Sequence, residues 1–277
     1  MAKPVILAVA PVSHDLPKGS HCGLTAEGVA RDVIACANAG ASMVHLHVRD
    51  AQGNLSEDLT VYDDTVRRIR KESDIVIQGS TGGASELTRE QRCVAIRHPL
   101  TEVASLNIGS VNFGEGVYIN TIRDIRYWAD QMLETGIVPD MEVFDLSMVG
   151  TARRLLTEGR IRKPILALGI GFENALEATR HNADLMFAEF RTLPGAVIGL
   201  TQHAMKDFDL FRHAIEHGVD VVRVGFEDGF ALDGGETAAT NLQLVQNAAE
   251  IIRGMGRELA SPDYVRTLFG VENKEKK

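Results

Sequence analysis

The chain has 277 residues and a formal net charge of −9, with 44% hydrophobic and 24% charged residues. This composition is typical of a globular protein rather than a disordered one, and the acidic surface argues against nucleic-acid binding. Three widely spaced cysteines, with no signal peptide and no long apolar run, favour a cytoplasmic protein without a membrane anchor.

Short apolar runs alternate with longer helical patterns along the chain. Continuous apolar runs are typical of parallel strands covered on both faces, and eight are predicted, at 4–10, 42–48, 74–78, 103–108, 138–144, 165–169, 195–200 and 219–224. Helices are predicted after them, at 25–39, 61–72, 88–97, 119–135, 148–158, 173–190, 204–217 and 237–257. Thr25 suits a helix N-cap, whereas Gly40, Gly136 and Gly218 suit helix ends.

Eight strands in alternation with eight helices predict a single (β/α)8 TIM barrel over residues 1–277. An open, doubly wound sheet is the alternative architecture. Against it, the first strand is followed by Pro11-Val12-Ser13-His14, which lacks the glycine pattern of a dinucleotide-binding turn.

Two histidines, His45 and His47, lie in the second predicted strand. Side chains two residues apart share one face of a strand, so both rings are expected to face the barrel interior near its C-terminal rim. Active sites of TIM barrels lie at this rim, and paired imidazoles are suitable zinc ligands. A pair of hydrogen-bonded core histidines is the alternative, because a metal site needs a third ligand.

An arginine and three acids on later strands are candidates to complete this site. Arg223 lies within the eighth predicted strand, and Glu227 and Asp228 follow at its end, where they would face the same mouth. Glu227 is the candidate third metal ligand. Glu142 lies inside the fifth strand, where a buried acid needs a cation such as Arg223 or the metal. Helix capping and structural ion pairs are the alternatives.

Neutral hydrogen-bond donors follow the third and fourth strands. After the third strand, backbone N–H groups and hydroxyls could cradle a carboxylate, at Ser80, Thr81, Gly82 and Gly83. An ordinary turn is the alternative for this segment. Ser105 and Asn107 share one face of the fourth strand and could also contact a ligand. Three histidines in predicted rim loops could do the same: His14, His21 and His203.

Taken together, these segments resemble the β-keto acid cleavage enzyme family. The matching stretches occur in the same order over most of the chain and read HLHVRD at 45–50, QGSTGG at 78–83, ASLNIGSVNF at 104–113, EVFD at 142–145 and VRVGFED at 222–228. The first and the last of these are specific to the family, whereas the others would be weak alone.

The resemblance implies a zinc-dependent TIM barrel, usually a homotetramer, although another divalent metal would suit the same ligands. Such an enzyme converts a β-keto acid and acetyl-CoA into acetoacetate and a new acyl-CoA by a retro-Claisen route. Carried over by position, His45, His47 and Glu227 would bind zinc, and Asp228 would be the general base, tuned by Arg223 and Glu142. The keto acid would be held by Ser80, the loop to Gly83, Ser105 and Asn107.

Two segments depart from the family pattern. After the first strand the family often carries an Asn-Gly-Ala-Glu-like stretch, whose acid recognises an amino group, but this chain has Pro11 to Asp15. After the sixth strand a Gly-Gly-rich loop is common, but here residues 169–173 read GIGFE. We therefore expect a β-keto acid other than the aminohexanoate, and a changed reaction stays open.

Three other functions compete with this interpretation. An amidohydrolase-type barrel also uses HxH, but on its first strand and with later histidines that this chain lacks at the corresponding strands. A metal-dependent aldolase or lyase would share the enolate chemistry without acetyl-CoA. A non-enzymatic binding barrel would retain the cluster for stability alone.

Overall fold

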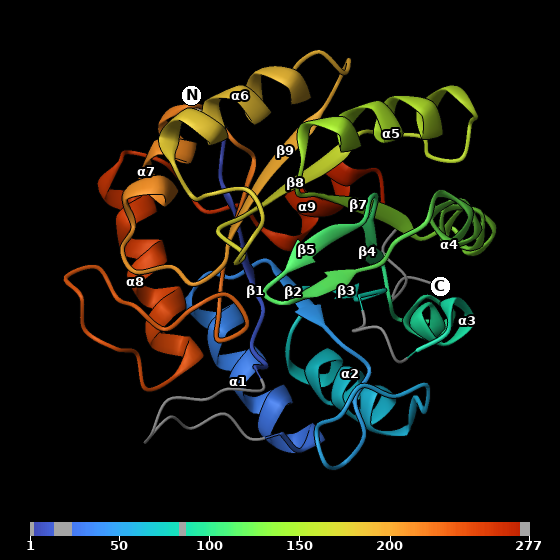
Figure 1. Cartoon of the computed structure of the whole chain (residues 1–277). Coiled ribbons are helices and arrows are strands. Elements are labelled where there is room, and N and C mark those ends of the chain that lie inside the picture. The colour runs from blue at the N-terminus through green and yellow to red at the C-terminus, as the bar shows by residue number, and fades with distance from the viewer. Residues whose placement is uncertain (1–2, 14–23, 83–86, 272–277) are drawn as a thin grey trace.

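The computed structural model describes residues 3–13, 24–82 and 87–271. Eight parallel strands form a closed barrel in the order β1-β10-β9-β8-β7-β4-β3-β2 (Figure 1). They are β1 (Ile6–Val9), β2 (Met43–Leu46), β3 (Val76–Gly79), β4 (Val103–Asn107), β7 (Val138–Val143), β8 (Ile165–Ile170), β9 (Val197–Gln202) and β10 (Val221–Val224). The TIM barrel predicted from the sequence is thereby confirmed.

Helices surround the barrel and connect successive strands (Figure 1). They are α1 (Ala26–Ala39), α2 (Thr60–Glu72), α3 (Arg89–Arg92), the 3-10 helix η1 (Val94–Arg97), α4 (Ile122–Thr135), α5 (Leu146–Thr157), α6 (Arg180–Phe190), α7 (Asp209–Glu216) and α8 (Asn241–Gly254). The predicted cap is confirmed, since the Thr25 side chain accepts a hydrogen bond from the Gly28 N–H, and Gly40 and Gly136 end α1 and α4. Within the described ranges, no helix combines the length and apolarity needed to cross a bilayer.

Several predicted boundaries are wrong. The helix expected at 173–190 begins only at Arg180, and the one expected at 204–217 begins at Asp209. Asn174 and Ala204 adopt φ angles of 60° and 51°, and such left-handed residues interrupt a right-handed helix. The helix expected at 88–97 is divided into α3 and η1 by Cys93, whose φ and ψ of −101° and 13° are not helical.

Two elements had no counterpart in the sequence-based prediction. A short antiparallel hairpin, β5 (Val111–Phe113) and β6 (Gly116–Tyr118), follows β4 and crosses the front of the barrel in Figure 1. A last helix, α9 (Pro262–Phe269), lies behind the strands in that view. Ser261 caps α9 through the Tyr264 N–H, and Gly270 ends it in a left-handed conformation.

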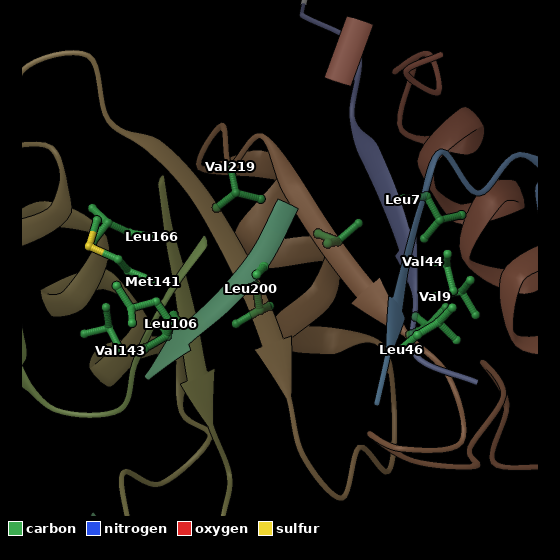
Figure 2. Packing of buried hydrophobic residues seen from close by; sticks show 14 of the residues in the cluster. Leu7, Val9, Val44, Leu46, Leu106, Met141, Val143, Leu166, Leu200 and Val219 are labelled. Atoms are coloured by element: carbon green, nitrogen blue, oxygen red, sulfur yellow. The ribbon is translucent and has the colours of Figure 1, made fainter. Parts of the chain in front are cut away.

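Alternate residues of each strand face the helices and the barrel interior. Leu7 and Val9 of β1 lie beside Val44 and Leu46 of β2 in the outer core between strands and helices (Figure 2). The residues between them belong to the opposite face of the pleat. Since Val44 and Leu46 face outward, His45 faces the interior.

The interior is apolar at the base of the barrel, where α9 closes it. Val265 and Phe269 of α9 join Ile6, Val103 and Ile165 in a second buried cluster. Arg266 of α9 is 4% exposed and is held by Glu102 and Asp74 at 2.6 and 2.9 Å. The opposite, C-terminal end of the interior is polar, and it contains the candidate site.

Candidate metal centre and substrate pocket

Three potential metal ligands converge at the C-terminal end of the barrel. His45 lies in β2, His47 follows that strand directly, and Glu227 follows β10. The two Nε2 atoms are 3.4 Å apart, and Glu227 Oε1 lies 3.6 Å from His45 Nε2 and 3.5 Å from His47 Nε2. Donors that each lie about 2.1 Å from a tetrahedral ion are about 3.4 Å from one another, so the three side chains fit zinc or a similar divalent metal.

A buried hydrogen-bond chain fixes the His45 ring. Its Nδ1 donates to Gln78 Oε1 at 2.7 Å, and Gln78 Nε2 donates to Asp140 Oδ2 at 2.7 Å. Burial lowers the pKa of His45 to about 3, so the imidazole is neutral at physiological pH. With the proton on Nδ1, the Nε2 lone pair is directed at the other two ligands, as metal binding requires.

Arg223 contacts three buried or half-buried acids, one of which is the candidate ligand Glu227. Its Nε and Nη2 bind Asp228 in a bidentate manner at 2.8 and 2.6 Å, its Nη2 lies 3.4 Å from Glu227 Oε1, and its Nη1 lies 3.9 Å from Glu142 Oε1. The side chains of Arg223 and Asp228 are 9% and 3% exposed. Such a desolvated, charge-assisted pair fixes the orientation of both groups.

The acids around Arg223 differ in their electrostatics. Burial raises the pKa of Glu142 to about 7 and that of Asp228 above its usual range, although Arg223 lowers both. Burial also disfavours the Glu227 carboxylate, but His45, His47 and Arg223 outweigh it and hold the pKa of Glu227 below its usual range. The site therefore combines an ionised ligand with acids poised for proton transfer.

A pocket of about 280 Å³ opens directly over the three ligands. Part of its wall is polar and consists of the ligands themselves with Arg223, Glu142, Thr201, Ser80, Gly82 and Arg49. The rest is apolar and mainly aromatic, formed by Leu55, Phe113, Tyr118, Phe144 and Phe172. Asp228 does not line the pocket and lies behind Arg223. The arrangement suits a small anionic ligand with an oxygen near the metal-ligand group.

Residues 4–271 match the sequence profile of the beta-keto acid cleavage enzymes. The chain belongs to this family. The sequence-based recognition is thereby confirmed over nearly the whole chain.

Two characterised relatives define the chemistry of the family. The chain is 34% identical over 254 residues to the 3-keto-5-aminohexanoate cleavage enzyme of Fusobacterium nucleatum, which covers 90% of each chain. It is 31% identical over 286 residues to the 3-oxoadipate:acetyl-CoA acetyltransferase of Cupriavidus necator, which covers 99% of this chain and 98% of the relative. As a family member, the protein is an enzyme that cleaves β-keto acids with acyl transfer.

A solved structure shares the fold. The ternary complex of ObcA with a C4-CoA adduct and oxalate superimposes with a TM-score of 0.75 at 22% identity. The match covers 90% of this chain and 67% of ObcA. At this level of identity the likeness concerns the barrel architecture alone.

Some of the residues predicted to contact the substrate of this beta-keto acid cleavage enzyme line the pocket, whereas others are buried and do not reach it. Ser80 and Gly82 line the pocket, where the Gly82 N–H donates to Ser80 Oγ at 2.9 Å. Thr81 is fully buried, and its hydroxyl donates to the Ser105 carbonyl at 2.6 Å, while its N–H donates to Ser105 Oγ at 3.2 Å. Thr81 and Ser105 thus connect the ends of β3 and β4. Gly83 lies outside the described residues.

Asn107 has a different environment. Its side chain is fully buried at the end of β4, and neither its Oδ1 nor its Nδ2 has a hydrogen-bond partner within the part of the chain that the structure describes. An unpaired buried amide is costly, so Asn107 stands out among the buried polar side chains near the site.

Some site residues were not assigned a role from the sequence. Asp140 lies two residues before Glu142 on the same face of β7, so strand periodicity was an available signal for it. Gln78 lay within a recognised segment, but its bond to His45 depends on the pairing of β2 with β3. Tyr118 and Phe172 lie on a hairpin and a loop that the hydrophobic pattern did not predict.

Other histidines have separate surroundings. The expectations for His14 and His21 fall outside the described residues. His203, at the end of β9, stacks on Phe172 with ring centroids 4.5 Å apart. A second group of possible ligands lies on the outside of the barrel and consists of Asp184 of α6, His213 of α7 and His217, which follows α7. His213 Nε2 is already 2.7 Å from Asp184 Oδ1.

Proposed function

We propose that the protein is a metal-dependent acyltransferase that converts a β-keto acid and acetyl-CoA into acetoacetate and a new acyl-CoA, with zinc as the preferred ion. The observation that carries this proposal is the convergence of His45, His47 and Glu227 at tetrahedral spacing beside the Arg223–Asp228 pair. The family assignment supports the β-keto acid and acetyl-CoA as reactants.

His45, His47 and Glu227 would hold the metal, since one ring is fixed as a neutral ligand and the carboxylate is ionised. When bound, the ion would polarise the keto oxygen and stabilise negative charge on it. Ser80, which lines the pocket, would bind the polar end of the keto acid. Asn107 is fully buried and does not line the pocket, so its unpaired amide would contact the keto acid only after neighbouring side chains shift.

Asp228 would act as the general base and remove a proton from C2 of the β-keto acid. The C2 carbanion then attacks the thioester carbon of acetyl-CoA, and CoA leaves as the thiolate. The thiolate next attacks C3 of the original keto acid, so that the C2–C3 bond breaks and its electron pair remains on C2. Protonation of C2 by Asp228 releases acetoacetate, and the original acyl group leaves as the CoA thioester.

Arg223 would position Asp228 and counter its charge, and Glu142 would complete this arrangement from the pocket wall. Because Asp228 is buried behind Arg223, the bidentate pair must shift for the carboxylate to reach C2. Glu142, which lines the pocket with a pKa raised by burial to about 7, is the competing base.

The first prediction separates these two bases. In D2O, the metal-loaded protein should catalyse exchange of deuterium into C2 of acetoacetate, measured by NMR. Asp228→Asn should slow this exchange by about 100-fold to 10,000-fold, the range expected for loss of a positioned base, while metal content is unchanged. Glu142→Gln is the matched control and should retain most of the exchange; the reverse result would assign the base to Glu142.

Acyl transfer itself is tested with radiolabelled acetyl-CoA. When acetoacetate itself is the β-keto acid, the reaction regenerates acetoacetate and acetyl-CoA, with the acetyl group exchanged between them. Label from [14C]acetyl-CoA should therefore enter acetoacetate. Cleavage of keto acids at full rate without acetyl-CoA would instead identify an aldolase or lyase, and the metal-free protein should be inactive in either assay.

We further propose a cytoplasmic homotetramer, since the resemblance to the family implies this assembly. Light scattering on the purified protein would measure the mass directly, and a monomeric species of 30.2 kDa would contradict the proposal.

A further inference from the structure

One wall of the substrate pocket is a continuous aromatic cluster. Phe113, Phe172 and His203 form a parallel stack, with centroids 4.3 Å apart at 10° between the first two rings and 4.5 Å apart at 5° between the last two. Phe144 meets Phe113 and Phe172 edge to face, at 5.3 and 5.5 Å. Of these four side chains, Phe113, Phe144 and Phe172 line the pocket, and we define them, with Leu55 of the same pocket, as the aromatic wall. His203 supports this wall by stacking on Phe172.

The backbone after β8 is shaped around this wall. A Cβ on Gly169 would lie 2.4 Å from Phe144 Cε1, so this position must be glycine for the Phe144 ring to pack there. Gly171 has a φ of 89°, and a Cβ on it would lie 2.7 Å from the His203 carbonyl oxygen. The two glycines therefore permit the close packing that places Phe172 between its neighbours.

The hairpin and the loop after β8 are tied together at the mouth. The Gly114 N–H donates to the Glu173 carbonyl at 3.0 Å, and Asn174 Nδ2 donates to the Gly114 carbonyl at 3.0 Å. Phe113 and Phe172, next to these two bonds, are thereby held in register. The aromatic wall is a preformed surface rather than a set of loose side chains.

Three arginines near this wall donate hydrogen bonds within the protein. Arg92 Nη2 donates to Tyr118 Oη at 3.2 Å, Arg49 Nη1 donates to the Gly53 carbonyl at 2.7 Å, and Arg223 is held by Asp228. Within the described residues, the aromatic wall itself carries no acid and no lysine or arginine. A carboxylate or an ammonium group placed against these hydrocarbon side chains would lose hydration without gaining a hydrogen-bond partner or counter-ion from them.

Ring orientation also disfavours a cation. Phe172 has stacked partners within 4.5 Å, and two rings at such distances must occupy its opposite faces. The ring therefore presents its edge to the pocket, and an aromatic edge carries partial positive charge. Cation–π binding needs a free aromatic face, so this wall is suited to hydrocarbon.

From this geometry we propose that the aromatic wall binds the substituent on C3 of the β-keto acid, and that this substituent is an uncharged alkyl or aryl group. The inference rests on the proposed function, in which the C1 carboxylate and C3 oxygen lie toward the metal-ligand group. The C3 substituent must then extend into the remaining, apolar part of the pocket. The named relatives act on an amino-substituted and a carboxylate-substituted keto acid.

The test uses three six-carbon substrates that differ at one group: 3-oxohexanoate, 3-oxoadipate and 3-keto-5-aminohexanoate. With the zinc-loaded protein and acetyl-CoA, we expect kcat/KM for 3-oxohexanoate to exceed the other two by at least about 100-fold. Lengthening the alkyl group from methyl to propyl should raise kcat/KM by about fourfold per methylene, as expected for burial of hydrocarbon. Equal or better turnover of either charged substrate would overturn the inference.

Substitutions at Phe172 test whether the aromatic wall is the cause of the preference for an uncharged substituent. Phe172→Ser should lower kcat/KM for 3-oxohexanoate at least tenfold, mainly through KM, whereas Phe172→Leu retains hydrocarbon and should stay within about threefold of the wild type. In Phe172→Ser, kcat/KM for 3-oxohexanoate should fall at least threefold more than the rate of label exchange into acetoacetate, because a methyl group offers less hydrocarbon to the wall than a propyl group does. Unchanged discrimination in Phe172→Ser would disprove this role.

Label exchange into acetoacetate distinguishes a failure of the proposed function from a failure of the inference about the aromatic wall. If the metal-loaded wild type does not exchange label between acetyl-CoA and acetoacetate, the proposed function is wrong, and the inference falls with it. If exchange occurs but the propyl substrate gains nothing over the methyl one, the proposed function survives and the aromatic wall does not bind the substituent.

Discussion

Gln78 is a buried residue that orients one of the three candidate metal ligands. Its carbonyl oxygen accepts the Nδ1 proton of His45, and its amide is in turn held by Asp140. A histidine ligand depends on such a partner for its tautomer and its ring orientation. The polar residues inside β3 and β7 therefore have a functional explanation, although they lie below the pocket.

We expect Gln78→Leu to weaken zinc binding by about 10-fold to 100-fold, the usual cost of losing the hydrogen-bond partner of a metal-bound histidine. The measurement is a competition titration against a chromogenic chelator. Gln131→Leu, at a half-buried position of α4, is the matched control and should bind zinc as the wild type does. Equal zinc affinity in the two variants would show that His45 needs no partner.

Glu142 should make the metal-free protein less stable as the pH rises. Its folded-state pKa of about 7 lies above the ordinary value of 4.5, so between these values the folded chain keeps a proton that the unfolded chain has lost. Stability therefore falls from pH 4.5 to 7, by about 1–3 kcal/mol for this group. In EDTA, Glu142→Gln should gain in urea-unfolding free energy over the wild type as the pH rises; a constant difference would contradict the prediction.

At the scale of elements, the apolar part of the pocket depends on two connections rather than on the barrel strands. The β5–β6 hairpin supplies Phe113 and Tyr118, and the loop after β8 supplies Phe172. The candidate metal ligands and the acids lie in the barrel strands or directly after them. The candidate ligands and much of the apolar lining thus come from different elements, and loops change more readily than strands between relatives.

Gly169→Ala should disturb the substrate end of the site and spare the metal end. The added methyl group would collide with Phe144, so we expect KM for 3-oxohexanoate to rise about 10-fold while zinc affinity stays within twofold. Gly150→Ala, inside α5 with open space around its Cα, is the control and should be neutral or slightly stabilising. A rise in KM of similar size in both variants would disprove the role of Gly169.

The sequence predicted the barrel strands well because their apolar runs are buried on both sides, and a period of two then assigns His45 to the interior. It could not predict the hairpin, whose three-residue strands are too short for a periodic signal. Residues 173–179 read as helical, but Asn174 is held in a left-handed conformation by a tertiary bond to Gly114. The packing role of Thr81 depends on the register between strands, which one sequence does not encode locally.

For the molecule as a whole, the two ends of the barrel have separate tasks. The base is an apolar core closed by α9, where Arg266 and Arg70 neutralise the buried Glu102. The other end is polar and carries the metal-ligand group and the pocket. Stability can therefore be altered at the base without direct contact to the site.

Phe269→Ala should test this separation. Loss of the buried ring leaves a cavity at the base and should reduce the free energy of unfolding by about 3–5 kcal/mol, measured by urea denaturation. Below the transition, KM and zinc affinity should match those of the wild type. Thr267→Ala, at an exposed position of the same helix, is the control and should lower the free energy of unfolding by less than about 1 kcal/mol. A large change in KM with Phe269→Ala would show that base and mouth are coupled.

The pairing of β1 with β10 closes the barrel between residues that are more than 200 positions apart. The site at its mouth can therefore form only late in translation. When the second imidazole, His47, has just been translated, the carboxylate that completes the set, Glu227, is still about 180 codons away. At roughly 5–20 residues per second, the nascent chain waits on the order of 10–40 s before all three donors exist. The complete set of three candidate ligands therefore exists only after β10 has been made and has paired with β1.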